Sequence, residues 1–266
     1  MRNIKMTVSY EGTAYCGWQI QNKESSIQAT IQDRYYELFK EKIHLIGSGR
    51  TDAGVHSLNQ IVNFKTSILL EPHRIQRALN AKLPKDIRIK NVCTAPLNFH
   101  ARYDAIGKTY LYIINIGEVD NLILSRFSTK ITYPLNIQGI DQGIKYFLGE
   151  HDFSAFTSKG SDPGSYVRNI IDFRVLEQNN LMAFVVTGNG FLYKMVRTMV
   201  GTLIEVGRSK ISPKDIPIII ESKERKNAGP TANPEGLILA QVYYELDEMD
   251  DFLKQLKNKK ILDLLS

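Results

Sequence analysis

The order in which strand-like and helix-like segments follow one another most constrains how this 266-residue chain can fold. Apolar residues alternate in strand-like segments and recur every three to four residues in helix-like ones. The first 104 residues contain, in order, a strand at 4–8, a helix from Ser25 to Phe39, strands at 43–46 and 60–64, a helix from Pro72 to Leu83, and a strand at 87–92. Ser25 and Gln28 have the spacing of a capping box, which predicts Ser25 as the N-cap of the first helix. The predicted order is β-α-β-β-α-β.

The same order of elements recurs between residues 105 and 245. The sequence predicts a strand at 109–116, a helix at about 137–148, strands at 169–176 and 181–187 with a turn at Asn179 and Asn180, a long helix at about 191–206, a short helix near Pro213, and a strand at 237–244. No residue-level repeat accompanies this duplication. We therefore predict an α+β fold of two ferredoxin-like halves with mainly antiparallel sheets, at residues 1–104 and 105–245, followed by a helical tail at 246–266.

The net charge of +6 arises in the first half alone. Residues 1–104 carry 15 Lys and Arg against 9 Asp and Glu, whereas residues 105–266 carry 19 of each. Part of the surplus lies in the basic segment at residues 73–90, where Asp86 is the single acidic residue. Its six basic residues are Arg74, Arg77, Lys82, Lys85, Arg88 and Lys90. Such a segment suits a polyanion, because each cation that neutralises a phosphate releases counterions. A charge run is more often a solvated helix face, so the surplus permits RNA binding without establishing it.

Several classes of protein are disfavoured by what the sequence lacks. It has no apolar run long enough to span a bilayer, and its N-terminus enters a strand-like alternation at once, which predicts no signal peptide. Cys16 and Cys93 are far apart and form no CxxC pair, so a reducing, cytoplasmic setting is expected. Five scattered histidines without paired spacing do not suggest a metal site, and we find no P-loop, Rossmann glycine pattern or zinc-ligand spacing.

The segment at residues 47–56, GSGRTDAGVH, is predicted to be a tight turn between strand-like residues. Its three glycines allow unusual backbone angles and let a bulky ligand approach the main chain. Arg50 and Asp52 are two residues apart, so in an extended segment both side chains point to the same side. The arginine favours the ionised aspartate, which can act as a nucleophile or a general base. Taken alone, the pattern is more often a structural turn in which Asp52 accepts backbone N–H groups.

The rest of the sequence changes that weighting. GRTDAGVH at residues 49–56 is accompanied, in the expected order along the chain, by six further motifs: YEGTAYCGWQ at 10–19, NAKLPKDI at 80–87, FHAR at 99–102, KTYLY at 108–112, GFLYKMVR at 190–197 and AGPTANPEGL at 228–237. Together they resemble the tRNA pseudouridine synthase A family over about residues 3–245. The chain is therefore identified as a member of that family.

This resemblance implies a pseudouridine synthase fold whose two halves form a central cleft. It implies that the enzyme converts uridine to pseudouridine at positions 38, 39 and 40 of the tRNA anticodon stem-loop. Asp52 corresponds to the family's essential aspartate. The reaction breaks the C1′–N1 glycosidic bond, rotates the uracil and rejoins it through C5, so no metal or other cofactor is expected. Whether the aspartate attacks the sugar, attacks the base or removes a sugar proton is left open.

The resemblance also gives roles to three other residues. Tyr110 matches the active-site tyrosine, whose ring would stack on the uracil. Arg197 matches the arginine that pairs with the catalytic aspartate. Arg50 is expected to hold the RNA and to fill the space left when the target nucleotide is flipped out of its stack. The family acts as a homodimer in which one tRNA contacts both subunits, so a homodimer is expected here.

Two other functions fit parts of the pattern. A non-catalytic RNA-binding protein could use two ferredoxin-like units and a basic half without any need for Asp52. A glycosidase or nucleosidase acting on small molecules would commonly need a second carboxylate as general acid, and the matched motifs around Asp52, Tyr110 and Arg197 supply none. Of the remaining motif residues, we interpret His56 and His100 as structural and Trp18 as part of the core.

Overall fold

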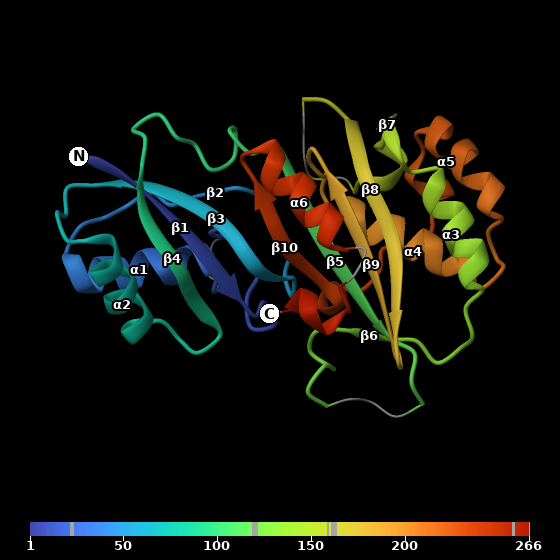
Figure 1. Cartoon of the computed structure of the whole chain (residues 1–266), viewed down its shortest axis with the longest axis horizontal. Helices are drawn as coiled ribbons and strands as arrows, with labels where there is room; N and C mark the ends of the chain where they lie inside the picture. Colours follow the sequence, from blue (N-terminus) through green and yellow to red (C-terminus); the bar gives the residue numbers. More distant parts are fainter. Residues whose placement is uncertain (22–23, 119–121, 159, 161–163, 257–258, 266) are drawn as a thin grey trace. The chain divides into compact units, whose positions relative to one another are not determined.

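The computed structural model describes residues 1–21, 24–118, 122–158, 160, 164–256 and 259–265 (Figure 1). The chain divides into two compact units. The first contains Met1–Ala105 together with Ile238–Tyr244, and the second contains Ile106–Leu237 together with Glu245–Ser266. Residues 257–258 and 266 of the expected helical tail lie outside the described residues. Both units are mixed α/β with mostly antiparallel strands.

The first unit has the predicted β-α-β-β-α-β order. Its elements are β1 (Arg2–Tyr10), α1 (Ile27–Phe39), β2 (Ile46–Gly47), β3 (His56–Thr66), α2 (Pro72–Lys82) and β4 (Ile87–Ala95). β1 pairs antiparallel with both β3 and β4, and β2 pairs antiparallel with β3. The order β4-β1-β3-β2 is the ferredoxin-like arrangement, and this part of the fold prediction is confirmed. β10 (Leu237–Tyr243) adds a short parallel pairing to the start of β3.

The core of the first unit lies between this sheet and its two helices (Figure 1). Alternate residues of β1, namely Ile4, Met6 and Val8, are fully buried, because successive side chains of a strand point to opposite faces. The apolar faces of α1 and α2 complete the same cluster with five more buried residues: Ile27, Ile31, Tyr35, Ile75 and Leu79. The helical spacing of Ile27, Ile31 and Tyr35 in the sequence is thus the spacing of the residues that α1 buries.

The cap of α1 differs from the predicted one by a residue. Ser26, not Ser25, is the N-cap, and its hydroxyl accepts a hydrogen bond from the Ala29 N–H at 3.2 Å. Ser25 instead accepts the Cys16 N–H on its carbonyl, in the segment that precedes the helix. Gln28 does not close a capping box, because its side-chain amide donates to the Leu45 carbonyl at 2.8 Å. Pairing with distant backbone decided both positions, and local spacing cannot reveal such partners.

From β5 to α4 the second unit has the predicted order β-α-β-β-α, with additional short elements, but the last strand predicted for this half, β10, groups with the first unit. Its strands and helices are β5 (Gly107–Asn115), β6 (Thr129–Lys130), α3 (Ile137–Lys145), β7 (Gly149–Asp152), β8 (Val167–Gln178), β9 (Leu181–Gly188), α4 (Met195–Gly207), α5 (Ile216–Ser222) and α6 (Leu246–Leu256). Short 3₁₀ helices occur at Ser154–Phe156, Pro213–Asp215, Arg225–Asn227, Pro234–Gly236 and Leu262–Leu265. The strands are ordered β5-β9-β8-β7 with antiparallel neighbours, and β6 lies parallel to β5.

The helix α4 begins four residues later than its sequence pattern predicts. Its N-cap, Lys194, has a left-handed backbone with φ of 60°, so the helix cannot extend back to Phe191. From Met195 onward almost every residue is buried. Burial on nearly all sides places α4 in the interior of the unit, so the side chain of Arg197 near its start is largely removed from water, whereas Glu205 near its end forms an ion pair with Arg208.

Candidate active site

Asp52 lies in the loop at residues 48–55, which connects β2 to β3 in the first unit. Its side chain is half-buried, whereas Arg50, two residues earlier in the same loop, is exposed. The loop closes with a turn in which the Val55 N–H donates to the Asp52 carbonyl at 3.1 Å. Gly54 inside this turn has φ of +78°, a conformation that other residues rarely adopt. The predicted glycine-dependent turn is therefore present.

A second segment, near the end of β1, braces this loop along its backbone. Gly17 forms an antiparallel bridge with Asp52, and the Trp18 N–H donates to the Thr51 carbonyl at 3.1 Å. The buried Tyr10 hydroxyl is hydrogen-bonded to the Thr51 hydroxyl at 2.9 Å. Burial raises the pKa of Tyr10, so this phenol stays protonated at neutral pH. The loop beside Asp52 is thus held by the backbone of residues 17–18 and by a buried side chain.

Glycines in the bracing segment permit the close approach. Gly17 has φ of +110°, and a Cβ atom at this position would lie 2.5 Å from the Thr51 carbonyl oxygen. At Gly12 a Cβ atom would lie 2.0 Å from the Val55 carbonyl oxygen. The Gly12 N–H also donates to Nδ1 of His56 at 3.0 Å. Gly12 and Gly17 are therefore two positions of the motif at residues 10–19 where the Asp52 loop lies too close for a side chain.

Two motif residues have the packing roles expected of them. Trp18 is 3% exposed and belongs to the core cluster of the first unit. Its indole ring lies against Gly47, where a Cβ atom would come within 2.7 Å of the ring. His56 is buried at the start of β3 and accepts the Gly12 N–H. The prediction that Trp18 belongs to the core is confirmed, and the contacts of His56 support a structural role.

Tyr110 lies in the middle of β5 in the second unit. It is 7% exposed, and its backbone pairs with Val186 of β9. The Tyr110 ring meets the Phe191 ring edge-on, with centroids 5.2 Å apart. An edge-to-face contact fixes the plane of a ring by electrostatic preference. Phe191, which comes from the loop before α4, therefore orients the tyrosine that the resemblance assigns to the uracil.

Tyr112 is a further residue at this place that sequence reasoning did not single out. It follows Tyr110 by two residues on β5, so both side chains point to the same face of the strand. Its hydroxyl is hydrogen-bonded to the Thr129 hydroxyl at 2.7 Å and donates to the Asn233 carbonyl at 2.9 Å. Burial raises the pKa of Tyr112, and the positive charge of Arg197 opposes that shift in part. The alternation within KTYLY was the signal that could have identified it.

Arg197 is the third residue of α4 and is only 9% exposed. Its Nε–H donates to the Ala232 carbonyl at 2.7 Å. In return, the Ala232 N–H donates to the Arg197 carbonyl at 3.0 Å. An arginine on a helix is usually solvated, and a buried guanidinium requires hydrogen-bond acceptors. The burial of Arg197 is a structural sign of function that the sequence pattern alone did not supply.

The segment at residues 228–236 matched the family motif but received no role from the sequence. It lies directly on α4, since a Cβ atom at Gly201 would come within 1.8 Å of the Pro230 carbonyl oxygen. The guanidinium of Arg225 donates to the Thr231 hydroxyl at 2.9 Å. Desolvation lowers the pKa of Arg225. The segment is therefore the support that holds Ala232 against Arg197.

The predicted site residues divide between the two units. Arg50 and Asp52 share one loop in the first unit. Tyr110 and Arg197 belong to the second unit, where Asn233, bonded to Tyr112, directly follows the residue that holds Arg197. The pairing of Arg197 with Asp52 across the units stays a prediction, as does the central cleft.

The basic segment is at the surface of the first unit. The four residues predicted to bind RNA, Arg74, Arg77, Lys82 and Lys85, are all exposed on or just after α2. Its buried face is made by Ile75 and Leu79, and Arg77 lies on the opposite side of the helix, whereas Lys82 is its last residue and Lys85 follows it. Their accessibility suits a polyanion, and their contact with RNA stays a prediction.

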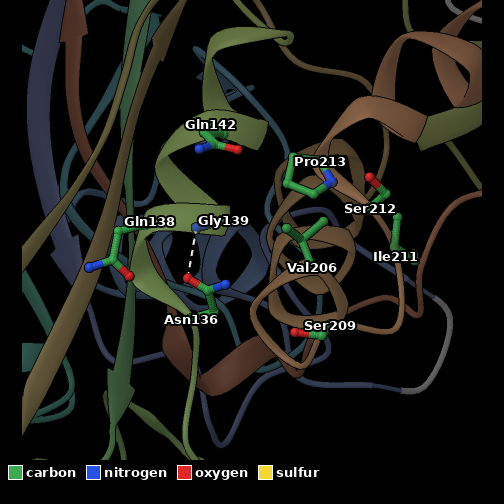
Figure 2. A pocket seen from close by; sticks show the side chains of 9 residues that line it. All are labelled: Asn136, Gln138, Gly139, Gln142, Val206, Ser209, Ile211, Ser212 and Pro213. Atoms are coloured by element: carbon green, nitrogen blue, oxygen red, sulfur yellow. Dashed lines mark hydrogen bonds between the residues drawn. The ribbon is translucent and has the colours of Figure 1, made fainter.

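One pocket of the second unit is lined by none of the predicted site residues. This pocket of about 310 Å³ is bordered by α3, the end of α4 and the following loop (Figure 2). Its lining carries no charged side chain, and the Asn136 side chain there accepts the Gly139 N–H at 3.0 Å. Within the described part of the chain, no group of His, Cys, Asp and Glu residues is arranged to hold a metal ion. No helix there is long and apolar enough to cross a membrane.

Comparison with known proteins reveals similarity over most of the chain. The family model described as tRNA pseudouridine synthase matches residues 6–104 and 144–245. The tRNA pseudouridine synthase A of Caldicellulosiruptor bescii is 44% identical over 244 residues, which are 92% of this chain and 100% of that protein. Its counterpart in Acetivibrio thermocellus is 45% identical with the same coverage. A chain in the solved "Crystal Structure of a Cbf5-Nop10-Gar1 Complex" aligns with a TM-score of 0.36 and 13% identity, over 94% of this chain and 64% of that one.

Proposed function

The chain belongs to the tRNA pseudouridine synthase family, and we propose that it isomerises uridines 38, 39 and 40 of the anticodon stem-loop with Asp52 as the essential carboxylate. The observation that carries the proposal is the position of Asp52. It lies half-buried in a glycine-containing loop whose backbone is braced by Gly17, Trp18 and Tyr10. A reactive carboxylate benefits from such rigid support, because small displacements of a catalytic group slow the reaction strongly.

The reaction rearranges bonds without adding or removing atoms overall. The C1′–N1 bond breaks, the uracil turns, and a C1′–C5 bond forms. C5 then loses its proton, and the freed N1 is protonated. Asp52 would act at the sugar or at the base during the first of these steps, as a nucleophile or as a base. No electron acceptor or donor is needed, so the side chains of the protein are sufficient for the chemistry.

Tyr110 and Arg197 are proposed to complete the site from the second unit. The Tyr110 ring, fixed edge-on by Phe191, offers an aromatic face on which the uracil can stack. The guanidinium of Arg197, anchored at Nε by Ala232, would pair with the Asp52 carboxylate. A buried, anchored arginine suits this role, since it loses little side-chain freedom when the pair forms.

Arg50 is proposed to assist in extruding the target nucleotide. A uridine within a stacked stem is inaccessible at C1′ until it is flipped out. Arg50 is exposed and lies two residues from Asp52, so its planar guanidinium can enter the vacated space. The exposed basic residues of α2 would hold the surrounding phosphates.

We propose further that the protein acts as a homodimer in the cytoplasm. The homodimer follows from family membership, in which one tRNA contacts both subunits. Cys16 and Cys93 are both free thiols, which suits a reducing compartment.

Tritium release from tRNA labelled at uridine C5 tests the proposed reaction, because C5 loses its hydrogen only when pseudouridine forms. The wild-type protein should release tritium, and the Asp52→Ala and Asp52→Asn variants should release none while binding tRNA. Release of free uracil would instead indicate a nucleosidase. Binding without release by the wild type, on several unmodified tRNAs, would indicate a non-catalytic RNA-binding protein.

A further inference from the structure

The segment that follows β4 leaves an aromatic ring in solvent. Tyr103 is 76% exposed, a large fraction for an aromatic residue within an ordered segment. One face of its ring lies on the imidazole of His100, with centroids 4.2 Å apart and planes inclined by 26°. Tyr103 is therefore held flat against a second ring, while most of its surface faces water.

The imidazole beneath Tyr103 is fixed by its own hydrogen bonds. Nδ1 of His100 accepts the backbone N–H groups of Arg102 and Tyr103, each at 3.2 Å. The backbone of the same residue is also held: the backbone N–H of His100 donates to the Asp104 carboxylate at 2.9 Å, and the backbone N–H of Asp104 donates to the His100 carbonyl at 3.1 Å. Because Nδ1 accepts, the neutral ring carries its proton on Nε2. These bonds set the plane on which the tyrosine rests.

The whole segment is anchored to the sheet of the first unit by buried polar side chains. Asn63 accepts the Ala101 N–H on its side-chain oxygen at 2.9 Å and donates to the Phe99 carbonyl at 3.2 Å. Asn3 also donates to the Phe99 carbonyl, at 2.9 Å. The Tyr244 hydroxyl donates to the Ala101 carbonyl at 2.7 Å. An exposed ring on such a rigid support has already lost the freedom that binding would otherwise cost it.

Positive charge lies beside the exposed ring. The guanidinium carbon of Arg102, an exposed residue, is 5.8 Å from the centre of the Tyr103 ring. Asp104 places one carboxylate nearby, but that group is engaged by the His100 N–H. An aromatic face next to an arginine is the chemistry that recognises a nucleotide, with the base on the ring and the phosphate at the cation. A purely apolar partner would offer no negative charge for Arg102 to contact.

We propose that Tyr103, supported by His100, is a stacking platform for an unpaired nucleobase of the bound RNA, with Arg102 at the adjoining phosphate. The inference rests on the proposed tRNA substrate but concerns binding, not the isomerisation step. It gives a role to the segment that follows the FHAR motif, in which the sequence pattern indicated only a structural histidine. Because RNA-specific proteins commonly stack unpaired bases on aromatic side chains, the platform takes a loop nucleotide and not a paired one.

Binding of unmodified tRNA to Tyr103→Ala and Tyr103→Phe, in the full-length protein at one fixed salt concentration, tests the platform. We expect Tyr103→Ala to raise Kd about tenfold, within the range measured for loss of one stacked base. Tyr103→Phe keeps the ring and should keep Kd within about twofold of wild type by the same reasoning. With the tyrosine removed but Arg102 intact, the dependence of binding on salt should not change, since the protein still neutralises the same number of phosphates.

Tyr36→Ala is the matched control. Tyr36 is 44% exposed on α1 with two lysines near its ring, but no second aromatic ring of the described residues supports it from below. The control should bind tRNA as the wild type does. The proposal is overturned if Tyr103→Ala binds tRNA with wild-type affinity, if Tyr103→Phe loses as much as Tyr103→Ala, or if Tyr103→Ala changes the oligomeric state in sedimentation, which would make the surface a protein interface.

The outcome can be separated from that of the proposed reaction. If the wild type released no tritium while Tyr103→Ala still weakened RNA binding, the platform would stand without the isomerase activity. If tritium release depended on Asp52 but not on Tyr103 even at tRNA concentrations far below KM, the reaction would stand and the platform would fall.

Discussion

Arg197 and Ala232 are joined by two hydrogen bonds that run in opposite directions. The Arg197 side chain donates through Nε to the Ala232 carbonyl at 2.7 Å, and the Ala232 N–H donates to the Arg197 carbonyl at 3.0 Å. The bond at Nε holds the guanidinium plane in one orientation while its outer nitrogens stay directed away from the stem. A lysine cannot reproduce this arrangement, because it has a single nitrogen and no fork.

The first prediction concerns Arg197. Replacement by Ala or by Lys should lower kcat at least about a hundredfold, the typical loss when one group that stabilises the transition state is removed. The Kd for tRNA should change far less. Arg208→Ala, at the C-cap of the same helix and paired with Glu205 at the surface, is the control and should be nearly silent. Single-turnover kinetics on saturating tRNA measure the effect, and a wild-type rate in Arg197→Ala would remove this residue from the site.

The second prediction concerns the contact between Gly17 and the Asp52 loop. In Gly17→Ala the added Cβ atom would lie 2.5 Å from the Thr51 carbonyl, so the loop must shift. A shift near 1 Å at a catalytic group costs about a hundredfold in rate. Gly149→Ala is the control, because Gly149 also has a positive φ, +91°, but open space around it. Both variants should lose some thermal stability. Only Gly17→Ala should lose kcat, and equal losses of kcat in the two would contradict the bracing role.

The third prediction concerns the basic face of α2. Simultaneous Ala substitution of Arg74, Arg77, Lys82 and Lys85 should weaken tRNA binding and flatten the plot of log K against log salt by about 0.7–0.9 for each phosphate that is no longer neutralised. The control removes four exposed lysines of the second unit, so the net charge changes equally: Lys145, Lys214, Lys226 and Lys254. An unchanged slope in the α2 variant, or an equal change in both, would exclude this face from the RNA footprint.

The fourth prediction concerns stability at high pH. Burial raises the pKa of Tyr35 from 10.0 to about 12, and its hydroxyl is bonded to the Thr66 hydroxyl at 2.8 Å. The folded state therefore holds this proton more tightly than the unfolded state does. The resulting stabilisation is fully present below pH 10 and is lost as pH rises from about 10 to about 12. Tyr35→Phe should unfold at lower denaturant at pH 8 but lose less stability between pH 9 and 11. Parallel pH profiles for the two proteins would contradict the assignment.

The periodicity of apolar residues in the sequence was sufficient to predict the order of elements in the first unit. Alternation in β1 and the helical spacing of α1 identified their buried residues, because those patterns reflect burial directly. The exact starts of the helices were harder to predict from the sequence. Ser26 rather than Ser25 caps α1, because Ser25 and Gln28 bond to backbone outside the helix. The start of α4 lies after Lys194 rather than at Phe191, because the backbone of Lys194 is left-handed.

At the candidate site, too, some features could be predicted from the sequence and others could not. The turn around Asp52 could be predicted from its glycines, because the positive φ of Gly54 is a conformation that residues with side chains rarely adopt. The support for Arg197 could not, because Ala232 is 35 residues away along the chain and contributes only its backbone. Every residue type has a backbone carbonyl, so the sequence does not show which carbonyl accepts a hydrogen bond. The role of the segment at residues 228–236 therefore became visible only in three dimensions.

The parallel pairing of β10 with β3 affects how the protein is made. Ile238 and Leu239 pair with His56 and Ser57 beside the Asp52 loop, yet the ribosome adds them after the strands and helices from β5 to α5. Until they emerge, the start of β3 at His56 and Ser57 lacks this partner, and unpaired strand edges invite association with other chains. A product truncated before β10 would keep that edge uncovered. We therefore expect such a product to be prone to aggregation although most of its sequence is intact.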